Sequence, residues 1–172
     1  MSGIREFYEI DEKEGIVVNK RLGKRAFLFG VEPWTSLVHR LFETFGSGAE
    51  TILFDTGKSY GISSAEEEKR TENDSELRIN FLSRKATTAG WGKIMVARES
   101  LEGFNIKVQR CVFCSEVDSP KEKQVPCFFL SGVISGFADV LFGPNRVREI
   151  HCGKDFCEFE LRIGTANTPQ AN

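Results

Sequence analysis

The sequence predicts an α+β fold in which an antiparallel sheet packs against helices. Short strand-like segments occur in pairs joined by brief turns, which favours antiparallel pairing. Longer segments with helical periodicity separate these pairs. The chain has 172 residues and shows no repeat, linker or second core. We therefore expect a single domain over 1–172, with a core at about 15–163 between a charged N-terminal lead and a polar tail.

Composition argues against several classes of protein. The formal net charge is −2 and the pI about 5.8, with no basic face for nucleic acid. The first fifteen residues are too charged for a secretory signal, and no apolar run approaches the roughly 18 residues of a membrane span. We expect a cytoplasmic protein, in which five cysteines are more often free, metal-bound or redox-active than bridged. Fifteen Phe indicate a phenyl-rich core or an apolar ligand pocket.

The first half of the chain predicts two strands and two helices. The strands lie in 15–30 around a turn at Gly23. A helix then begins at Glu32-Pro33 and ends at Gly46, with an apolar stripe at helical spacing: Trp34, Leu37, Val38, Leu41, Phe42 and Phe45. A second helix begins near Gly48. Its Gly57 and Gly61 share one face, which indicates either a close neighbour or space for a ligand.

The second half predicts two more helices and four strands. Residues 65–76 are interpreted as a solvated charged stretch that forms a helix end and a loop, and 76–90 as a helix that buries Leu77, Phe81 and Leu82. Strands follow at 93–100 and 103–116, then a polar loop at 119–124. The helix predicted at 126–143 is apolar nearly all round, so we expect it to be buried, and Gly132 and Gly136 repeat the four-residue spacing. The last strands are predicted at 146–152 and 156–163.

Two cysteines flank the four-residue loop of the final hairpin. This loop length predicts that Cys152 faces Cys157 and that Ile150 faces Phe159 across the strands. Opposed β-carbons in such a pair lie about 5 Å apart. That geometry suits two ligands of one zinc ion, a strained cross-strand disulfide, or two buried thiols above an apolar stripe.

A third cysteine makes a metal site more plausible. Cys127 lies in the first turn of the helix at 126–143, where amide hydrogens and the helix dipole favour a thiolate. Three cysteines with one carboxylate or imidazole complete a tetrahedral zinc site, and Glu149 and His151 are the candidates. Both face away from Cys152 in a regular strand, where Glu149 lies opposite Glu160. A bulge or an early strand end would have to turn one of them inward.

The remaining chemistry is sparse. Cys111 and Cys114 form a C-x-x-C, but within a strand pattern their side chains point to opposite faces. We interpret them as structural thiols, with a second metal site, or one shared with His151, as the alternative. No nucleophile–base–orienter set and no phosphate-binding loop is apparent, so we assign no catalytic residue and no organic cofactor.

These residues resemble the 4-vinyl reductase-type domain. The similar run comprises Pro126-Cys127, Gly132-x-x-x-Gly136, Phe137, Gly143, Val147-x-Glu149-x-x-Cys152 and Cys157-x-Phe159. In the first half, Gly48-Ala49, Ile52-Leu53 and Gly57-x-x-x-Gly61 are similar to the paired-glycine helix of that family. The resemblance covers roughly residues 15–163, and its C-terminal part is the more specific.

The resemblance implies a fold, a metal and a ligand class. The fold is an antiparallel sheet with packed helices, shared with the small subunits of the TRAPP vesicle-tethering complex. The family is regarded as binding small hydrophobic or aromatic molecules, both in a chlorophyll-pathway accessory protein and in phenol- and toluene-responsive activators. In those sensors three cysteines and one glutamate hold a zinc. The matching residues here are Cys127, Glu149, Cys152 and Cys157, although the spacing from Cys152 to Cys157 is shorter than in the sensors.

We therefore expect a sensor or carrier module with a structural zinc and an apolar cavity, more plausibly a binding protein than an enzyme. A homodimer is expected from the related fold, and a separate output partner is expected because the sequence shows no DNA-binding or ATPase segment. An accessory factor or enzyme in vinyl-tetrapyrrole reduction, and a TRAPP-like assembly scaffold, are the alternatives. The candidate pocket residues are Trp34, Phe42, Phe45, Gly57, Gly61, Phe128, Phe129, Gly132, Gly136 and Phe137.

Overall fold

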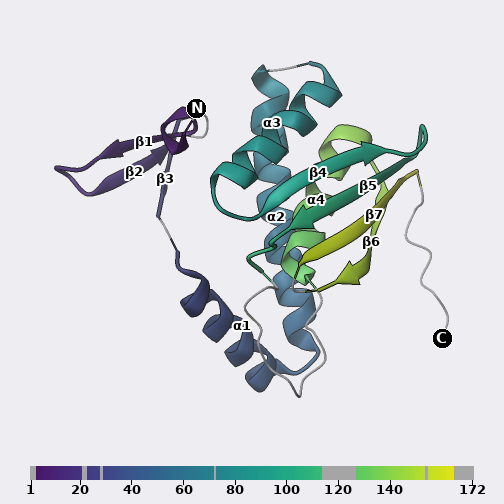
Figure 1. Ribbon diagram of the computed structural model, residues 1–172, viewed down its shortest axis with the longest axis horizontal. Helices are drawn as coiled ribbons and strands as arrows, with labels where there is room; N and C mark the ends of the chain where they lie inside the picture. The colour runs from purple at the N-terminus through teal and green to yellow at the C-terminus, as the bar shows by residue number, and fades with distance from the viewer. Residues whose placement is uncertain are drawn as a thin grey trace.

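Two antiparallel sheets and four α-helices form the described part of the chain (Figure 1). The computed structural model describes residues 3–20, 23–27, 29–71, 73–113, 127–153 and 155–164. The first sheet has the strand order β1-β2-β3, and the second has the order β4-β5-β7-β6. The α+β class predicted from the sequence is confirmed. No helix in these ranges is long and apolar enough to span a membrane.

The first sheet includes a strand that the sequence analysis missed. A short 3-10 helix (Ile4–Glu6) leads into β1 (Tyr8–Asp11), which pairs with β2 (Ile16–Asn19), and β2 pairs with β3 (Lys24–Ala26). The segment before residue 15 was predicted to be a charged lead outside the core. It is ordered instead because β2 supplies backbone partners, and because Phe7 is buried with its ring 5.2 Å from that of Phe81.

The four helices lie close to their predicted positions: α1 (Val31–Phe45), α2 (Gly48–Thr71), α3 (Ser75–Thr88) and α4 (Phe128–Phe142). The interpretation of 65–76 as a helix end agrees with the structure, but the segment is not solvated throughout. Helix α2 continues through most of it, and Ala65 and Glu68 are 0% and 1% exposed, in a helix that packs against α3. Of the three residues predicted to form the buried side of α3, Phe81 and Leu82 are half-buried, but Leu77 is 53% exposed, and Arg78 and Lys85 are buried instead.

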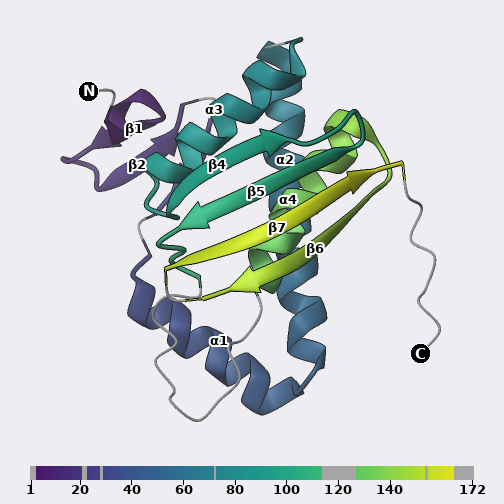
Figure 2. The same cartoon turned by 45° about the vertical axis from the view of Figure 1, so that its right-hand side comes forward.

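The second sheet supplies the main core. It contains β4 (Lys93–Arg98), β5 (Gly103–Gln109), β6 (Asn145–Cys152) and β7 (Phe156–Ile163). Directly opposed residues of β5 and β7 point to the same face, and the following six are all buried: Phe104, Ile106, Val108, Cys157, Phe159 and Leu161. Figure 2 shows α2 and α4 behind this sheet. Helix α4 packs on β6 and β7, and α2 packs on α4.

Four glycines allow the backbones of α2 and α4 to touch. A β-carbon added at Gly57 would lie 2.0 Å from the carbonyl oxygen of Phe129, and one added at Gly61 would lie 2.2 Å from that of Val133. From the other helix, added β-carbons at Gly132 and Gly136 would lie 2.0 and 2.1 Å from the carbonyl oxygens of Phe54 and Lys58. Of the two alternatives for the glycine faces, a close neighbour or space for a ligand, the structure has the close neighbour.

Substitution of Gly132 by alanine tests this contact. The added methyl group meets backbone, which cannot move aside, so Gly132→Ala should lower the free energy of unfolding by about 2–3 kcal/mol. Gly48→Ala is the matched control, because its new β-carbon would lie 3.6 Å from the Phe45 β-carbon, an ordinary contact. It should change stability by no more than about 1 kcal/mol in chemical denaturation. Equal losses in the two variants would contradict the close crossing.

Candidate functional site

A β-bulge shapes the final hairpin. Cys152 pairs with Cys157 as predicted, but the register shifts between Glu149 and His151. Glu149 therefore lies opposite Phe159, and Arg148 takes the predicted place of Glu149 opposite Glu160. The prediction that Ile150 faces Phe159 was wrong, because Ile150 is the extra residue of the bulge and is 46% exposed. The bulge turns Glu149 toward the face that carries Cys157.

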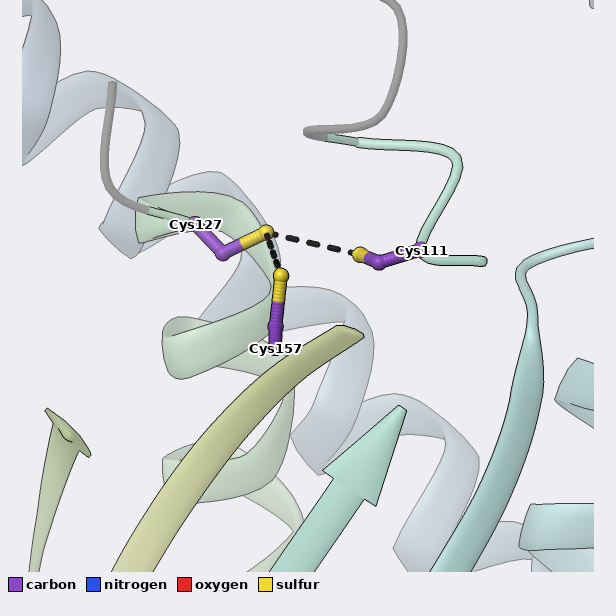
Figure 3. A group of neighbouring side chains, drawn as sticks. All are labelled: Cys111, Cys127 and Cys157. Atoms are coloured by element: carbon purple, nitrogen blue, oxygen red, sulfur yellow. Dashed lines mark hydrogen bonds between the residues drawn. The ribbon is translucent and has the colours of Figure 1, made fainter. Parts of the chain in front are cut away.

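Three cysteines from separate elements meet at one end of the sheet (Figure 3). Cys127 is the N-cap residue of α4, Cys157 lies on β7, and Cys111 follows β5. The Cys127 sulfur lies 3.5 Å from that of Cys111 and 4.0 Å from that of Cys157. All three residues are buried.

Glu149 and Cys152 lie beside this group. Glu149 Oε2 accepts a hydrogen bond from the Cys127 backbone N–H at 2.8 Å, and the Cys157 thiol donates to Cys152 Sγ at 3.7 Å. The donor atoms of Glu149, Cys152 and Cys157 lie within 4.8 Å of one another, as do the sulfurs of Cys111, Cys127 and Cys157. Cys157 belongs to both groups. The four predicted ligands therefore divide between two groups of three that share Cys157, one of which includes Cys111, and the assignment of a metal stays a prediction.

Burial and mutual repulsion shift the acidities of this cluster. Burial raises the pKa of Glu149, although the Cys127 N–H opposes that shift. A hydrogen bond with Cys157, followed by burial and the Glu149 charge, raises the pKa of Cys152. A hydrogen bond with Cys111 raises the pKa of Cys157 to about 12, and the same bond lowers that of Cys111. Several adjacent donors of this kind ionise together only when a cation compensates their charge.

The spacing of the sulfurs is compatible with a tetrahedral metal site. Zn–S bonds of about 2.3 Å place the sulfurs of such a site about 3.8 Å apart, close to the distances here. Glu149 Oε1 is buried without a hydrogen-bond partner among the described residues, so it has a lone pair to offer. His151, the other candidate for the fourth position, is exposed and stacks on Phe156 at 4.3 Å between ring centroids. Of these two candidates, Glu149 is the one whose carboxylate lies with two of the cysteines, Cys152 and Cys157.

Cys127 takes part in a disulfide bond. Because a metal binds the thiolate, Cys127 becomes a ligand only after reduction.

Sequence reasoning treated Cys111 as a structural thiol. Its proximity to Cys157 depends on the pairing of β5 with β7, in which Val108 lies opposite Cys157. No sequence pattern specified that strand order. Cys114, the other half of the C-x-x-C, lies outside the described residues.

An apolar cavity of about 110 Å³ lies between the second sheet, α2, α3 and α4. Its walls include Ile106 and Val108 of β5 and Ile134 of α4, and Tyr8 of β1 also reaches it. Phe137 is the only one of the ten predicted pocket residues that lines this cavity. The four glycines lie at the helix crossing instead, and Phe45 is 56% exposed on α1.

Several of the other predicted aromatic residues pack on one another. The Trp34 ring lies 5.2 Å from that of Phe129 and 5.4 Å from that of Phe113, and Phe113 lies 5.2 Å from Trp91. Trp91 is itself part of the cavity wall. This aromatic cluster adjoins the cysteines, because Phe113 and Phe129 follow Cys111 and Cys127 by two residues. Phe42 and Phe128 form a separate pair with 6.4 Å between ring centroids.

Tyr8 and Lys85 line the cavity although neither was predicted to do so. Tyr8 fell in the supposed charged lead. Lys85 is a charged residue and was not part of the apolar stripe used to predict the buried side of α3. Its place in the cavity wall is therefore apparent only from the packing of α3 against its neighbours.

Comparisons with known proteins identify the fold. The crystal structure of the phenol-responsive sensory domain of the transcription activator PoxR, with phenol, superposes with a TM-score of 0.77 at 16% identity, covering 93% of this chain and 86% of that one. A trafficking protein particle complex subunit 3 from Naegleria fowleri, covalently bound to palmitic acid, gives a TM-score of 0.58 at 15% identity over 79% and 93% of the chains. The chain thus has the TRAPP-like fold that the sequence resemblance implied. No family model and no curated protein matches the sequence, so the 4-vinyl reductase resemblance stays a prediction.

The cap that Glu149 provides to α4 can be tested in the absence of metal. Glu149→Ala removes the acceptor for the Cys127 N–H and should cost about 1–2 kcal/mol of unfolding free energy, measured with a chelator present. Glu149→Gln keeps an amide oxygen at this place and should lose less. If the two variants lose the same amount, the hydrogen bond does not stabilise the helix.

Proposed function

We propose that this chain is a small-molecule-binding module, a sensor or carrier, whose cavity accepts a small aromatic molecule. The observation that carries this proposal is the apolar cavity of about 110 Å³ between the second sheet and three helices. An engineered apolar cavity of about 150 Å³ binds benzene, so one ring with a small substituent matches this volume. The structural likeness to a sensory domain determined with phenol supports the same ligand class.

The proposal includes a structural zinc held by Cys127, Glu149, Cys152 and Cys157. Such an ion would tie the first turn of α4 to the hairpin of β6 and β7, which carry these residues. A closed four-coordinate site stabilises a fold and does not activate water. The spacing of the sulfurs and the unpartnered oxygen of Glu149 support it. We assign no catalytic residue.

Further parts of the proposal concern the setting of the protein. We regard residues 1–172 as a single cytoplasmic domain that forms a homodimer and signals through a separate output protein. The exposed apolar residues Leu37 and Phe45 of α1 support a contact with another chain, since they are 45% and 56% exposed. The cavity is several times smaller than a tetrapyrrole, which favours the binding module over a role in vinyl-tetrapyrrole reduction. An apolar cavity likewise favours it over a pure assembly scaffold.

Metal content tests the zinc site. Protein purified under reducing conditions without added metal should contain about one zinc per chain, and Cys152→Ser should lose it together with thermal stability. His151→Ala is the matched control, since His151 is exposed and adjacent in sequence, and it should keep its zinc. Without reductant, metal content should fall because Cys127 is disulfide-bonded. Metal-free reduced protein would rule out the site, and loss of zinc in His151→Ala would reassign the fourth ligand.

Filling the cavity tests the ligand proposal. Ala86 of α3 lines the cavity, so the ring of Ala86→Phe should occupy the space of the ligand. Calorimetric titration with phenol and toluene should detect binding to the wild type and a loss of at least tenfold in affinity in the variant, about 1.4 kcal/mol. Ala97→Phe, on the exposed side of β4, should bind as the wild type does. Unchanged binding in Ala86→Phe would place the ligand elsewhere.

A further inference from the structure

Three buried cysteines form a group of their own within the cluster (Figure 3). The sulfur of Cys127 lies 3.5 Å from that of Cys111 and 4.0 Å from that of Cys157, and all three sulfurs lie within 4.8 Å of one another. None of the three residues is more than 3% exposed. The other group shares Cys157 but adds the half-buried Glu149 and Cys152. One group therefore offers sulfur alone, and the other offers sulfur and a carboxylate.

A left-handed turn of the backbone brings Cys111 to this group. Val108 of β5 is buried, so in a regular continuation of the strand Cys111, three residues later, would point to the opposite, outer face. Arg110, just beyond the strand, instead has a φ of 53°, which residues other than glycine rarely adopt. The Val112 N–H then donates to the carbonyl oxygen of Trp91 at 3.2 Å. The turn returns Cys111 to the buried side of the sheet.

The position of Cys127 favours negative charge at this group. Cys127 is the N-cap residue of α4, a helix of 15 residues with no acidic residue in its first turn. The N–H groups of the first turn point toward this end of the helix and give it a partial positive charge. Thiolates that bind a monovalent ion keep a net negative charge, and the helix end offsets part of it. Burial also keeps water away from a bound ion.

We infer that Cys111, Cys127 and Cys157 form a second metal-binding set, which takes a soft, thiol-binding ion such as Cu(I) in three-coordinate geometry. Metal–sulfur bonds of about 2.3 Å place the sulfurs of a planar three-coordinate site about 4.0 Å apart, close to the spacing here. Soft ions prefer sulfur to oxygen, whereas zinc takes a fourth ligand and accepts a carboxylate. This inference goes beyond the proposed zinc site and does not depend on it. Because Cys127 and Cys157 would serve both ions, binding of Cu(I) displaces zinc.

Binding requires the reduced chain, because Cys127 takes part in a disulfide bond. A phosphine reductant converts this disulfide into two thiols and is itself oxidised to the phosphine oxide. Each coordinating thiol then releases its proton to the buffer as the metal binds. The backbone of Cys127 is held independently of its sulfur, since its N–H donates to Glu149 Oε2 at 2.8 Å. Reduction thus releases the side chain and leaves its attachment to the helix end in place.

A pair of cysteine variants separates the two ligand sets. The full chain, kept anaerobic with a phosphine reductant, is titrated with Cu(I) against a chromophoric Cu(I) chelator and with zinc against a zinc indicator. Cys111→Ser should lower the Cu(I) affinity at least about hundredfold, more than loss of an outer-shell partner costs, and should keep the zinc affinity. Cys152→Ser is the matched control, which should lose zinc and keep its Cu(I) affinity. Cu(I) added to the zinc-loaded wild type should release the zinc.

The outcomes distinguish this inference from the proposed zinc site. If folded Cys111→Ser binds Cu(I) as the wild type does, or loses zinc together with Cu(I), the second set is wrong. If Cu(I) binding depends on Cys111 but the wild type binds no zinc, the zinc site is wrong and this inference stands. Should Cys111→Ser not fold, X-ray absorption at the copper edge of the wild type decides alone. Three sulfur neighbours would support the set, and an oxygen neighbour or only two sulfurs would overturn it.

Discussion

The contact between α2 and α4 is the constraint on which the rest of the structure depends. Four glycines let the two backbones approach until no β-carbon fits between them. Helix α4 is thereby held between α2 on one side and strands β6 and β7 on the other. Its first turn then lies beside the end of the sheet, where Cys127 meets Cys157. Its middle and last turns supply Ile134, Phe137 and Phe142 to the cavity wall. One close crossing therefore positions both the cysteine cluster and the cavity.

The cysteine cluster and the cavity are neighbours that share a layer of aromatic side chains. Trp91 belongs both to the cavity wall and to the group of rings around Phe113 and Phe129. Those two phenylalanines follow Cys111 and Cys127 in the chain. Because packed interiors transmit small displacements, a change in the position of either cysteine acts on the rings that border the cavity. The rigidity of the cysteine cluster and the shape of the cavity thus both depend on this layer of aromatic side chains.

Local patterns predicted most of the secondary structure, and non-local packing accounts for what they missed. The stripe from Trp34 to Phe45 located α1, and the four-residue loop located the pairing of Cys152 with Cys157. The strand β1 was missed because its charged sequence depends on pairing with β2. Cys111 joined the cluster only through the strand order β4-β5-β7-β6, which no local signal encodes. The burial of Lys85 and Glu68 depends in the same way on helix packing, since both residue types are usually exposed.

The bulge at Ile150 places Glu149 and Cys152 on the same face of the sheet, although they are three residues apart in the sequence. Side chains alternate between the faces of a strand, so residues three apart point to opposite sides. The register counts only two steps from Glu149 to Cys152, because one residue is left out of the ladder. An odd interval in the sequence thus becomes an even interval in the sheet. A Glu-x-Cys sequence on a regular strand, without a bulge, would also place the carboxylate and the thiol on one face. A further single insertion or deletion that the bulge did not absorb would send the carboxylate to solvent, so lineages of this fold should vary this interval together with the bulge.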